Sequence, residues 1–267
     1  MLGIEWIVAF LLLGAFVGFM AGLLGVGGGG IMVPMLTTIF IAQGVPIEQV
    51  VHLALGTSMA SIIFTSLSSM RAHQAKGGVL WPIVKGMAGG ILVGTFIATF
   101  IAASISSLYL AIFFALFMAY VALQMFKNNK PTADKDISGS GELLLAGGGI
   151  GAISALVSIG GGSLTVPYLI WRNIELKKAI GTSAAIGLPI SIAGTLGFLI
   201  NGWSNTSMAD FTVGFIYLPA VILISMMSFI FAPYGVKMAH QLPVPVLKKV
   251  FALLLIMLSI KMLSAMI

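Results

Sequence analysis

Long apolar runs separated by short polar stretches make up this chain. The runs are continuous rather than alternating, which predicts buried or lipid-facing helices instead of half-exposed strands. Several reach the roughly 20 residues that a helix needs to cross a bilayer. The predicted apolar segments are residues 4–24, 31–43, 50–70, 79–103, 107–126, 143–159, 163–171, 179–201, 210–235 and 247–266. A stretch rich in Lys, Asp, Gly and Ser separates the fifth from the sixth, and its composition predicts a solvated linker.

Composition turns this pattern into a fold class. Of the 267 residues, 59% are hydrophobic and only 7% are charged, whereas a soluble domain has about 25% charged residues. We therefore expect an all-α integral membrane protein. A transmembrane β-barrel would show short alternating strands. The chain has no cysteine, which excludes disulfides and thiolate metal sites, and we expect no metal and no cofactor. The first 13 residues lack a basic region, so we expect the first helix to be retained rather than cleaved.

The two sets of segments match each other in order. The recurring landmarks are Gly27 to Gly30 with Gly160 to Ser163, Pro34 with Pro167, Gly56-Thr57-Ser58 with Gly181-Thr182-Ser183, Pro82 with Pro219, and Phe114-Ala115-Leu116 with Phe251-Ala252-Leu253. The spacing between partners is 133, 133, 125, 137 and 137 residues in turn. Such ordered agreement predicts an internal duplication. We expect a first transmembrane repeat over 1–126, a cytoplasmic linker over 127–142 and a second transmembrane repeat over 143–267.

The basic residues gather at alternate connections. Most of the thirteen Lys and Arg residues lie in or beside the connections 71–78, 127–142, 172–178 and 236–249, and none lies in the connections 44–49, 104–106 and 202–209. The positive-inside rule places the first group in the cytoplasm. Connections that correspond in the two repeats differ in charge, so the repeats are predicted to have inverted topology, as in many secondary transporters. Both termini are then expected outside the cytoplasm. Because the net charge of +6 lies in these connections, no nucleic-acid partner is expected.

Two glycine runs, 27–30 and 160–162, interrupt the apolar pattern. The segments after them are short, spanning roughly 20 Å and 14 Å as helices. Each run therefore predicts a hairpin that turns near the middle of the membrane, giving 8 to 10 membrane segments in total. Broken backbone at that depth must be buried in protein or line a cavity.

The chemistry expected at these breaks is anion binding. A helix that restarts after glycine leaves its first N–H groups without internal partners, and its positive dipole end favours a negative ligand. The repeated Gly-Thr-Ser motifs add hydroxyl groups. The candidate substrate-binding residues are Gly27, Gly28, Gly29, Gly30, Thr57, Ser58, Gly160, Gly161, Gly162, Ser163, Thr182 and Ser183. Tight helix packing is the alternative for the glycines, and bonding to the preceding turn is the alternative for the hydroxyls.

Two further residues are candidates for gating or coupling. His52 is predicted at the outer start of its span, where it could carry protons or serve as a helix-end group. Arg71 is predicted at the inner mouth, where it could attract anions or only set topology. No Asp or Glu lies clearly within a span, so no carboxylate proton relay is visible. That absence suits an anion carrier.

These features together resemble the sulfite exporter TauE/SafE family of membrane permeases, also called the toluene sulfonate uptake permease family. The resemblance covers nearly the whole chain. It rests on the run Ala21-Gly22-Leu23-Leu24-Gly25-Val26-Gly27-Gly28-Gly29 with its following Val-Pro, on the second Gly-Gly-Gly run with its Val-Pro, and on both Gly-Thr-Ser motifs. It implies sulfur-containing anions such as sulfite, sulfoacetate or other organosulfonates as substrates. The second run reads Val157-Ser158-Ile159-Gly160 in place of a Gly-Val-Gly entry, so the two half-sites are not expected to contribute equally.

The predicted function is a secondary-active carrier for such anions in the cell membrane. Its expected partners are a small anionic substrate, membrane lipid and a coupling ion, either a proton or sodium. An anion channel of the same fold is the alternative, which saturable uptake with counterflow would exclude. An enzyme is not expected, because Ser58 and His52 have no matching pair in the second repeat, where Lys177 precedes Ser183. No phosphate-binding loop ending in Gly-Lys-Ser/Thr is present.

Overall fold

The computed structural model describes residues 3–25, 27–127, 139–207, 211–239, 241 and 244–266. Within these ranges the chain forms ten α-helices: α1 (Ile4–Leu24), α2 (Gly29–Ala42), α3 (Ile47–Gln74), α4 (Trp81–Ser104), α5 (Ser107–Lys127), α6 (Ser140–Val157), α7 (Gly162–Trp171), α8 (Leu176–Asn201), α9 (Leu218–Ala239) and α10 (Val244–Met266). Seven of them, α1, α3, α4, α5, α6, α8 and α9, are long and apolar enough to cross a membrane. The α10 helix is 23 residues long. The chain is thus an all-α integral membrane protein, as its composition predicts.

Both glycine runs break the helical path where the sequence predicts. The α1 helix ends at Leu24 and α2 begins at Gly29, while α6 ends at Val157 and α7 begins at Gly162. The restarting helices are short, with 14 residues in α2 and 10 in α7. Each long helix with its short partner forms a helix–break–helix hairpin.

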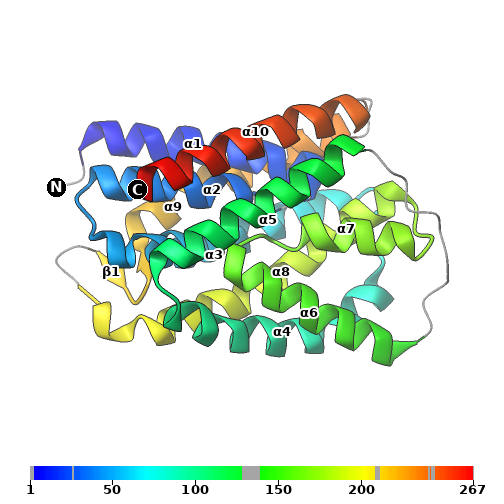
Figure 1. Cartoon of the computed structure of the whole chain (residues 1–267). Coiled ribbons are helices and arrows are strands. Elements are labelled where there is room, and N and C mark those ends of the chain that lie inside the picture. Colours follow the sequence, from blue (N-terminus) through cyan, green and yellow to red (C-terminus); the bar gives the residue numbers. More distant parts are fainter. Residues whose placement is uncertain are drawn as a thin grey trace.

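The connections between helices gather at the two ends of the bundle (Figure 1). The start of α1, the end of α10 and the turns α2–α3 and α4–α5 lie at the left of the picture. The turns α3–α4 and α7–α8, the end of α5 and the start of α10 lie at the right. This division matches the one that charge predicts, because the connections without Lys or Arg share one end. Residues 128–138 of the predicted linker 127–142 lie outside the described ranges, and α6 begins at Ser140, slightly before the predicted 143.

Helix packing pairs the two halves of the chain. The α1 helix lies along α9, and α6 lies along α4 in the same way. The α3 and α8 helices meet at the centre, and α5 packs on α10. Renumbering α1–α5 as α6–α10, and the reverse, exchanges the first two pairs and leaves the α3–α8 and α5–α10 pairs unchanged. Two equivalent repeats would produce this arrangement.

Glycines bring the paired helices close together. A Cβ atom on Gly14 of α1 would lie 2.6 Å from the Ile224 carbonyl oxygen of α9. A Cβ atom on Gly147 of α6 would lie 2.5 Å from the Met87 carbonyl oxygen of α4. Small residues let backbones approach each other in this way in membrane proteins. These glycines therefore have a packing role.

One predicted segment, 210–235, begins differently in the structure. Residues Thr212–Val213 (β1) and Ile216–Tyr217 (β2) form a short antiparallel hairpin, and α9 begins only at Leu218. Gly214 occupies the turn at φ 59°, a left-handed conformation that glycine adopts without a steric cost. A three-residue 3₁₀ turn, η1 (Trp203–Asn205), precedes it. Residues 208–210 are outside the described ranges.

Candidate functional site

The two breaks touch each other through their backbones. A Cβ atom on Gly27 would lie 2.7 Å from Gly160 Cα, and one on Gly160 would lie 2.9 Å from Gly27 Cα. A Cβ atom on Gly29 would fall directly on the Ser158 carbonyl oxygen. Any larger residue here would push the breaks apart, so the close approach explains the glycines at these positions. Gly27 and Gly29 of the first run are thus brought against Gly160 and Ser158 of the second break.

The helix caps on either side of the two breaks match. The α1 helix ends on Gly25 at φ 68°, and α6 ends on Ser158 at φ 48°, both left-handed. The N-caps of α2 and α7 are Gly28 at φ 83° and Gly161 at φ 79°. Glycine adopts such angles freely, whereas Ser158 holds its conformation at some cost. The hydrogen bonds also match, because each N-cap carbonyl accepts from the amides three and four residues later.

The start of α7 presents backbone amides. The amides of Leu164 and Thr165 donate to the Gly161 carbonyl oxygen, at 3.1 and 2.7 Å. No oxygen of a described residue accepts a hydrogen bond from the amide of Gly162 or of Ser163. Unpaired amides and the positive end of the helix dipole together favour an anion.

The two threonines of the Gly-Thr-Ser motifs cap helices of the opposite repeat. Thr57 Oγ1 of α3 accepts a hydrogen bond from the Tyr217 amide at 3.0 Å, directly before α9. Thr182 Oγ1 of α8 accepts one from the Leu80 amide at 3.0 Å, directly before α4. Both side chains are fully buried. Each therefore satisfies a partly buried amide at a helix start, a structural role that sequence reasoning did not identify.

The serines of the same motifs differ from each other. Ser183 Oγ donates to the Ile180 carbonyl oxygen at 2.8 Å and also lies 3.1 Å from the Gly25 carbonyl oxygen. Ser58 Oγ is buried and has no hydrogen-bond partner among the described residues. The Leu55 carbonyl oxygen, three residues before Ser58 in α3, accepts a hydrogen bond from Ser158 Oγ at 3.1 Å. The two motifs therefore differ in the hydrogen bonding of their serines.

Two hydroxyls that the sequence did not single out lie at the second break. Ser66 Oγ of α3 and Thr165 Oγ1 of α7 are buried, and neither has a hydrogen-bond partner within the described part of the chain. A Cβ atom on Gly161 would lie 3.2 Å from Thr165 Oγ1. Thr165 could have been found from the sequence, because it lies one turn into the helix that follows the glycines.

The structure does not bring the two gating candidates to the breaks. His52 lies near the start of α3, where Nε2 is 3.0 Å from the Ile105 carbonyl oxygen and Nδ1 is 3.2 Å from Ser107 Oγ. Ser107 Oγ in turn donates to the Glu48 carbonyl oxygen at 2.6 Å. His52 therefore joins the start of α3 to the α4–α5 turn. Arg71 is exposed near the other end of α3.

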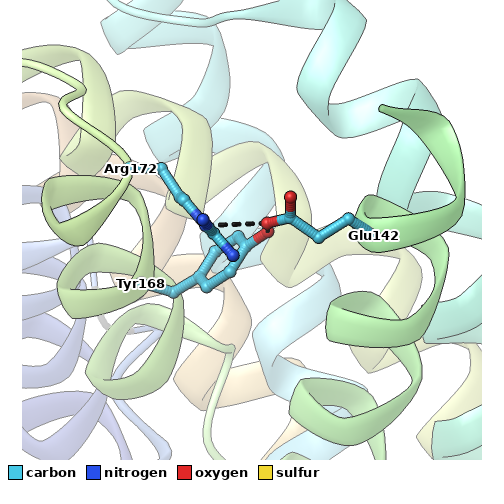
Figure 2. Close-up of polar contacts among 3 residues, drawn as sticks. All are labelled: Glu142, Tyr168 and Arg172. Carbon is cyan, nitrogen blue, oxygen red and sulfur yellow. Dashed lines mark hydrogen bonds and ion pairs between the residues drawn. The ribbon is translucent and has the colours of Figure 1, made fainter. Parts of the chain in front are cut away.

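Arg172, the residue that follows α7, forms an ion pair (Figure 2). Arg172 Nε lies 2.7 Å from Glu142 Oε1, at the start of α6. The Tyr168 hydroxyl donates to the same carboxylate oxygen at 2.6 Å. The guanidinium carbon also lies 4.8 Å from the ring centroid of Trp171, within range for a cation–π contact. These contacts hold α7 to α6 at the end opposite to the break.

Comparison with known proteins decides the family. A family model described as sulfite exporter TauE/SafE matches residues 10–262. The chain belongs to this sulfite exporter TauE/SafE family. A Haemophilus influenzae relative named "Probable membrane transporter protein" is 37% identical over 262 residues, which is 97% of this chain and 98% of that protein.

More distant relatives carry similar names. Probable membrane transporter proteins of Bacillus subtilis and Methanocaldococcus jannaschii are each 26% identical, and the matches cover 86% and 87% of this chain and 89% and 86% of those proteins. The comparison with solved structures found no match. This TauE/SafE chain is therefore a multi-pass membrane transporter and not an enzyme.

Proposed function

We propose that this TauE/SafE transporter moves small sulfur-containing anions, such as sulfite, sulfoacetate or other organosulfonates, by secondary-active transport. The anion binds near the middle of the membrane where the starts of α2 and α7 meet. One observation carries the proposal: the backbone contact between Gly27 and Gly160 brings two helix N-termini together at breaks in the membrane helices. The description of the family as sulfite exporters supports the class of substrate.

The two repeats, 1–126 and 143–267, are proposed to be inverted in the membrane. Matching N-cap conformations at the two breaks support the duplication. The division of the connections between the two ends of the bundle supports the inversion (Figure 1). With the basic end in the cytoplasm, both termini lie outside it, and the cell membrane is the proposed location.

Transport would proceed by movement of two helix groups against each other. One group contains α1, α3 and α9, and the other contains α6, α8 and α4; α9 packs on both α1 and α3, and α4 packs on both α6 and α8. The Thr57–Tyr217 bond lies within the first group and the Thr182–Leu80 bond within the second. The groups meet along α3 and α8, beside the breaks. Rocking about that interface would open the site to each side in turn, as in other inverted-repeat transporters.

Flux measurements in proteoliposomes test this function. Purified protein is reconstituted and offered sulfite, sulfoacetate, taurine or sulfate, with and without a proton or sodium gradient. We expect saturable uptake of at least one sulfur oxyanion, driven by one of the gradients and accelerated by the same anion on the other side. Conductance without counterflow would indicate a channel instead, and no flux with any of these anions would contradict the proposal.

A further inference from the structure

We propose that the second break is an uncharged oxyanion site that takes its side-chain donors from Ser66 and Thr165 and selects singly charged over doubly charged oxyanion groups. The inference rests on the proposed function and specifies its ligand. It assigns the binding hydroxyls to residues outside the Gly-Thr-Ser motifs.

Ser66 is directed at the break by the geometry of its neighbours. Its side chain is 2% exposed, and Oγ has no partner among the described residues. A Cβ atom on Gly187 of α8 would lie 2.6 Å from Ser66 Oγ and 2.9 Å from the Gly160 carbonyl oxygen. The absence of a side chain at Gly187 thus leaves the Ser66 hydroxyl next to the break.

The face of α3 that includes Ser66 is the one that contacts the breaks. Ser58, Ile62, Ser66 and Ser69 follow each other at intervals of three and four residues, which places them on one side of a helix. Ile62 Cγ2 would lie 3.5 Å from a Cβ atom on Gly27 and 3.4 Å from one on Gly160. All three serines are buried, and none has a hydrogen-bond partner within the described ranges. Unpaired hydroxyls therefore follow α3 along the breaks.

Thr165 supplies the second hydroxyl from the opposite side. Its side chain is fully buried, and no described residue pairs with Oγ1. The position 3.2 Å from a Cβ atom on Gly161 directs Oγ1 back toward the start of α7. There it would supplement the amides of Gly162 and Ser163, for which no described oxygen is an acceptor.

Unpaired buried hydroxyls are exceptions that call for an explanation. Most buried polar side chains have a hydrogen-bond partner, and leaving one without a partner costs about 1–3 kcal/mol. Other hydroxyls of α3 follow this rule, since Ser61 Oγ donates to the Thr57 carbonyl oxygen and Thr65 Oγ1 to that of Ser61. A bound oxyanion would satisfy Ser66 and Thr165 together with the α7 amides.

The positions in the other repeat that correspond to Ser66 and Thr165 carry no such pair of unpaired hydroxyls. The residue that corresponds to Thr165 is Met32, 133 positions earlier. The residue that corresponds to Ser66 is Ser191, 125 positions later, and its Oγ donates to the Leu188 carbonyl oxygen at 2.9 Å. The second break is therefore the better equipped of the two to hold an oxyanion.

The side chains around the second break favour a ligand group with a single negative charge. Among the atoms nearest to Gly160 and Gly161 are side-chain carbons of Ile62, Ile186 and Ile190, and all three residues are apolar. Arg172 lies roughly 15 Å away along α7 and is paired with Glu142 (Figure 2). The cost of removing an ion from water rises with the square of its charge, whereas its attraction to neutral donors rises only linearly. A singly charged group such as a sulfonate is therefore favoured over a doubly charged group such as sulfate.

Binding to purified protein in detergent tests the two residues. Ser66→Ala and Thr165→Val should each raise the Kd for methanesulfonate about ten-fold, because a hydrogen bond to a charged group is lost. Neither variant should lower the Tm, since no hydrogen bond within the described protein is removed. Ser191→Ala and Thr38→Val are matched controls, because their hydroxyls already donate to Leu188 and Pro34 carbonyl oxygens. Their Kd should stay at the wild-type value.

The ligand arm compares methanesulfonate with sulfate at neutral pH. We expect methanesulfonate to bind at least ten-fold more tightly than sulfate. Equal or tighter binding of sulfate would overturn the uncharged site. Wild-type Kd values in both Ser66→Ala and Thr165→Val would overturn the residue assignment, while saturable flux in wild-type proteoliposomes would leave the transport function intact. Absence of flux with every anion would count against that function instead.

Discussion

At the scale of single residues, Thr57 and Thr182 link the two halves of the chain. Each hydroxyl oxygen accepts a hydrogen bond from a partly buried backbone amide of the other half. Thr57→Val or Thr182→Val would leave the Tyr217 or Leu80 amide without this partner. We expect each to lower the free energy of unfolding by about 1–3 kcal/mol. The measurement is a thermal melt in detergent.

The conservative variant separates capping from ligand binding. Thr57→Ser keeps the hydroxyl and should keep most of the wild-type stability. A Thr57→Val protein that melts like the wild type but has lost methanesulfonate binding would assign this hydroxyl to the substrate rather than to the cap.

Gly29 is the residue for which a side chain is least compatible with the breaks. Because a Cβ atom there meets the Ser158 carbonyl oxygen, we expect Gly29→Ala to force the breaks apart and to lower the Tm strongly. The matched control is Gly149→Ala in α6, where no atom lies within 4 Å of the added Cβ. That variant should be neutral or slightly stabilising, because alanine favours helices by up to about 1 kcal/mol. Equal melting of the two variants would contradict the contact between the breaks.

The sequence reveals some of these residues and conceals others. Glycine runs are visible because they interrupt apolar segments, and repetition draws attention to Thr57 and Thr182. Their partners, Tyr217 and Leu80, are more than 100 residues away, and no local pattern indicates them. Ser66 is equally hidden, because a serine within a membrane helix usually bonds to its own preceding turn. Only the packing of α3 against the break shows that it does not.

At the scale of elements, apolar length predicts the helices well and fails where chain direction changes inside an apolar run. The segments around α1, α4 and α5 are predicted within a few residues. The hairpin of β1 and β2 is missed, because Phe211 to Phe215 is as apolar as the start of a helix and only Gly214 marks the turn. This hairpin also lies where the spacing between the repeats increases from 125 to 137 residues. The second repeat is longer at this point.

Movement between the two helix groups can be blocked by a cross-link. Met59 of α3 contacts Gly194 of α8, where an added Cβ would lie 3.1 Å from Met59 Cγ. We expect the pair Met59→Cys with Gly194→Cys, once oxidised, to abolish transport and to regain it on reduction. The chain has no native cysteine that could interfere.

A cross-link inside one group is the control for this experiment. Thr65 Oγ1 of α3 lies 2.7 Å from Ser228 Oγ of α9. Thr65→Cys with Ser228→Cys should form a disulfide and still transport, because both residues belong to the group that moves as a unit. Full activity in the oxidised α3–α8 pair would contradict rocking about that interface.

At the scale of the whole molecule, charge predicts which end faces the cytoplasm. Ser106 lies in the α4–α5 turn, Lys76 lies in the α3–α4 turn, and both are exposed. We expect Ser106→Cys to react with a membrane-impermeant maleimide in intact cells. Lys76→Cys should react only after the cells are opened. The reverse pattern would invert the proposed topology, and labelling of both from outside would contradict opposite ends.

The most direct measurement of the central claim is to locate a bound anion. Crystals grown with 2-bromoethanesulfonate, a singly charged sulfonate, would show its bromine by anomalous scattering. The account predicts a sulfonate within hydrogen-bond distance of the Gly162 and Ser163 amides and of the Ser66 and Thr165 hydroxyls, with the bromine a few ångströms away. A fully occupied anion elsewhere in the membrane-embedded part, with none where α2 and α7 begin, would contradict it.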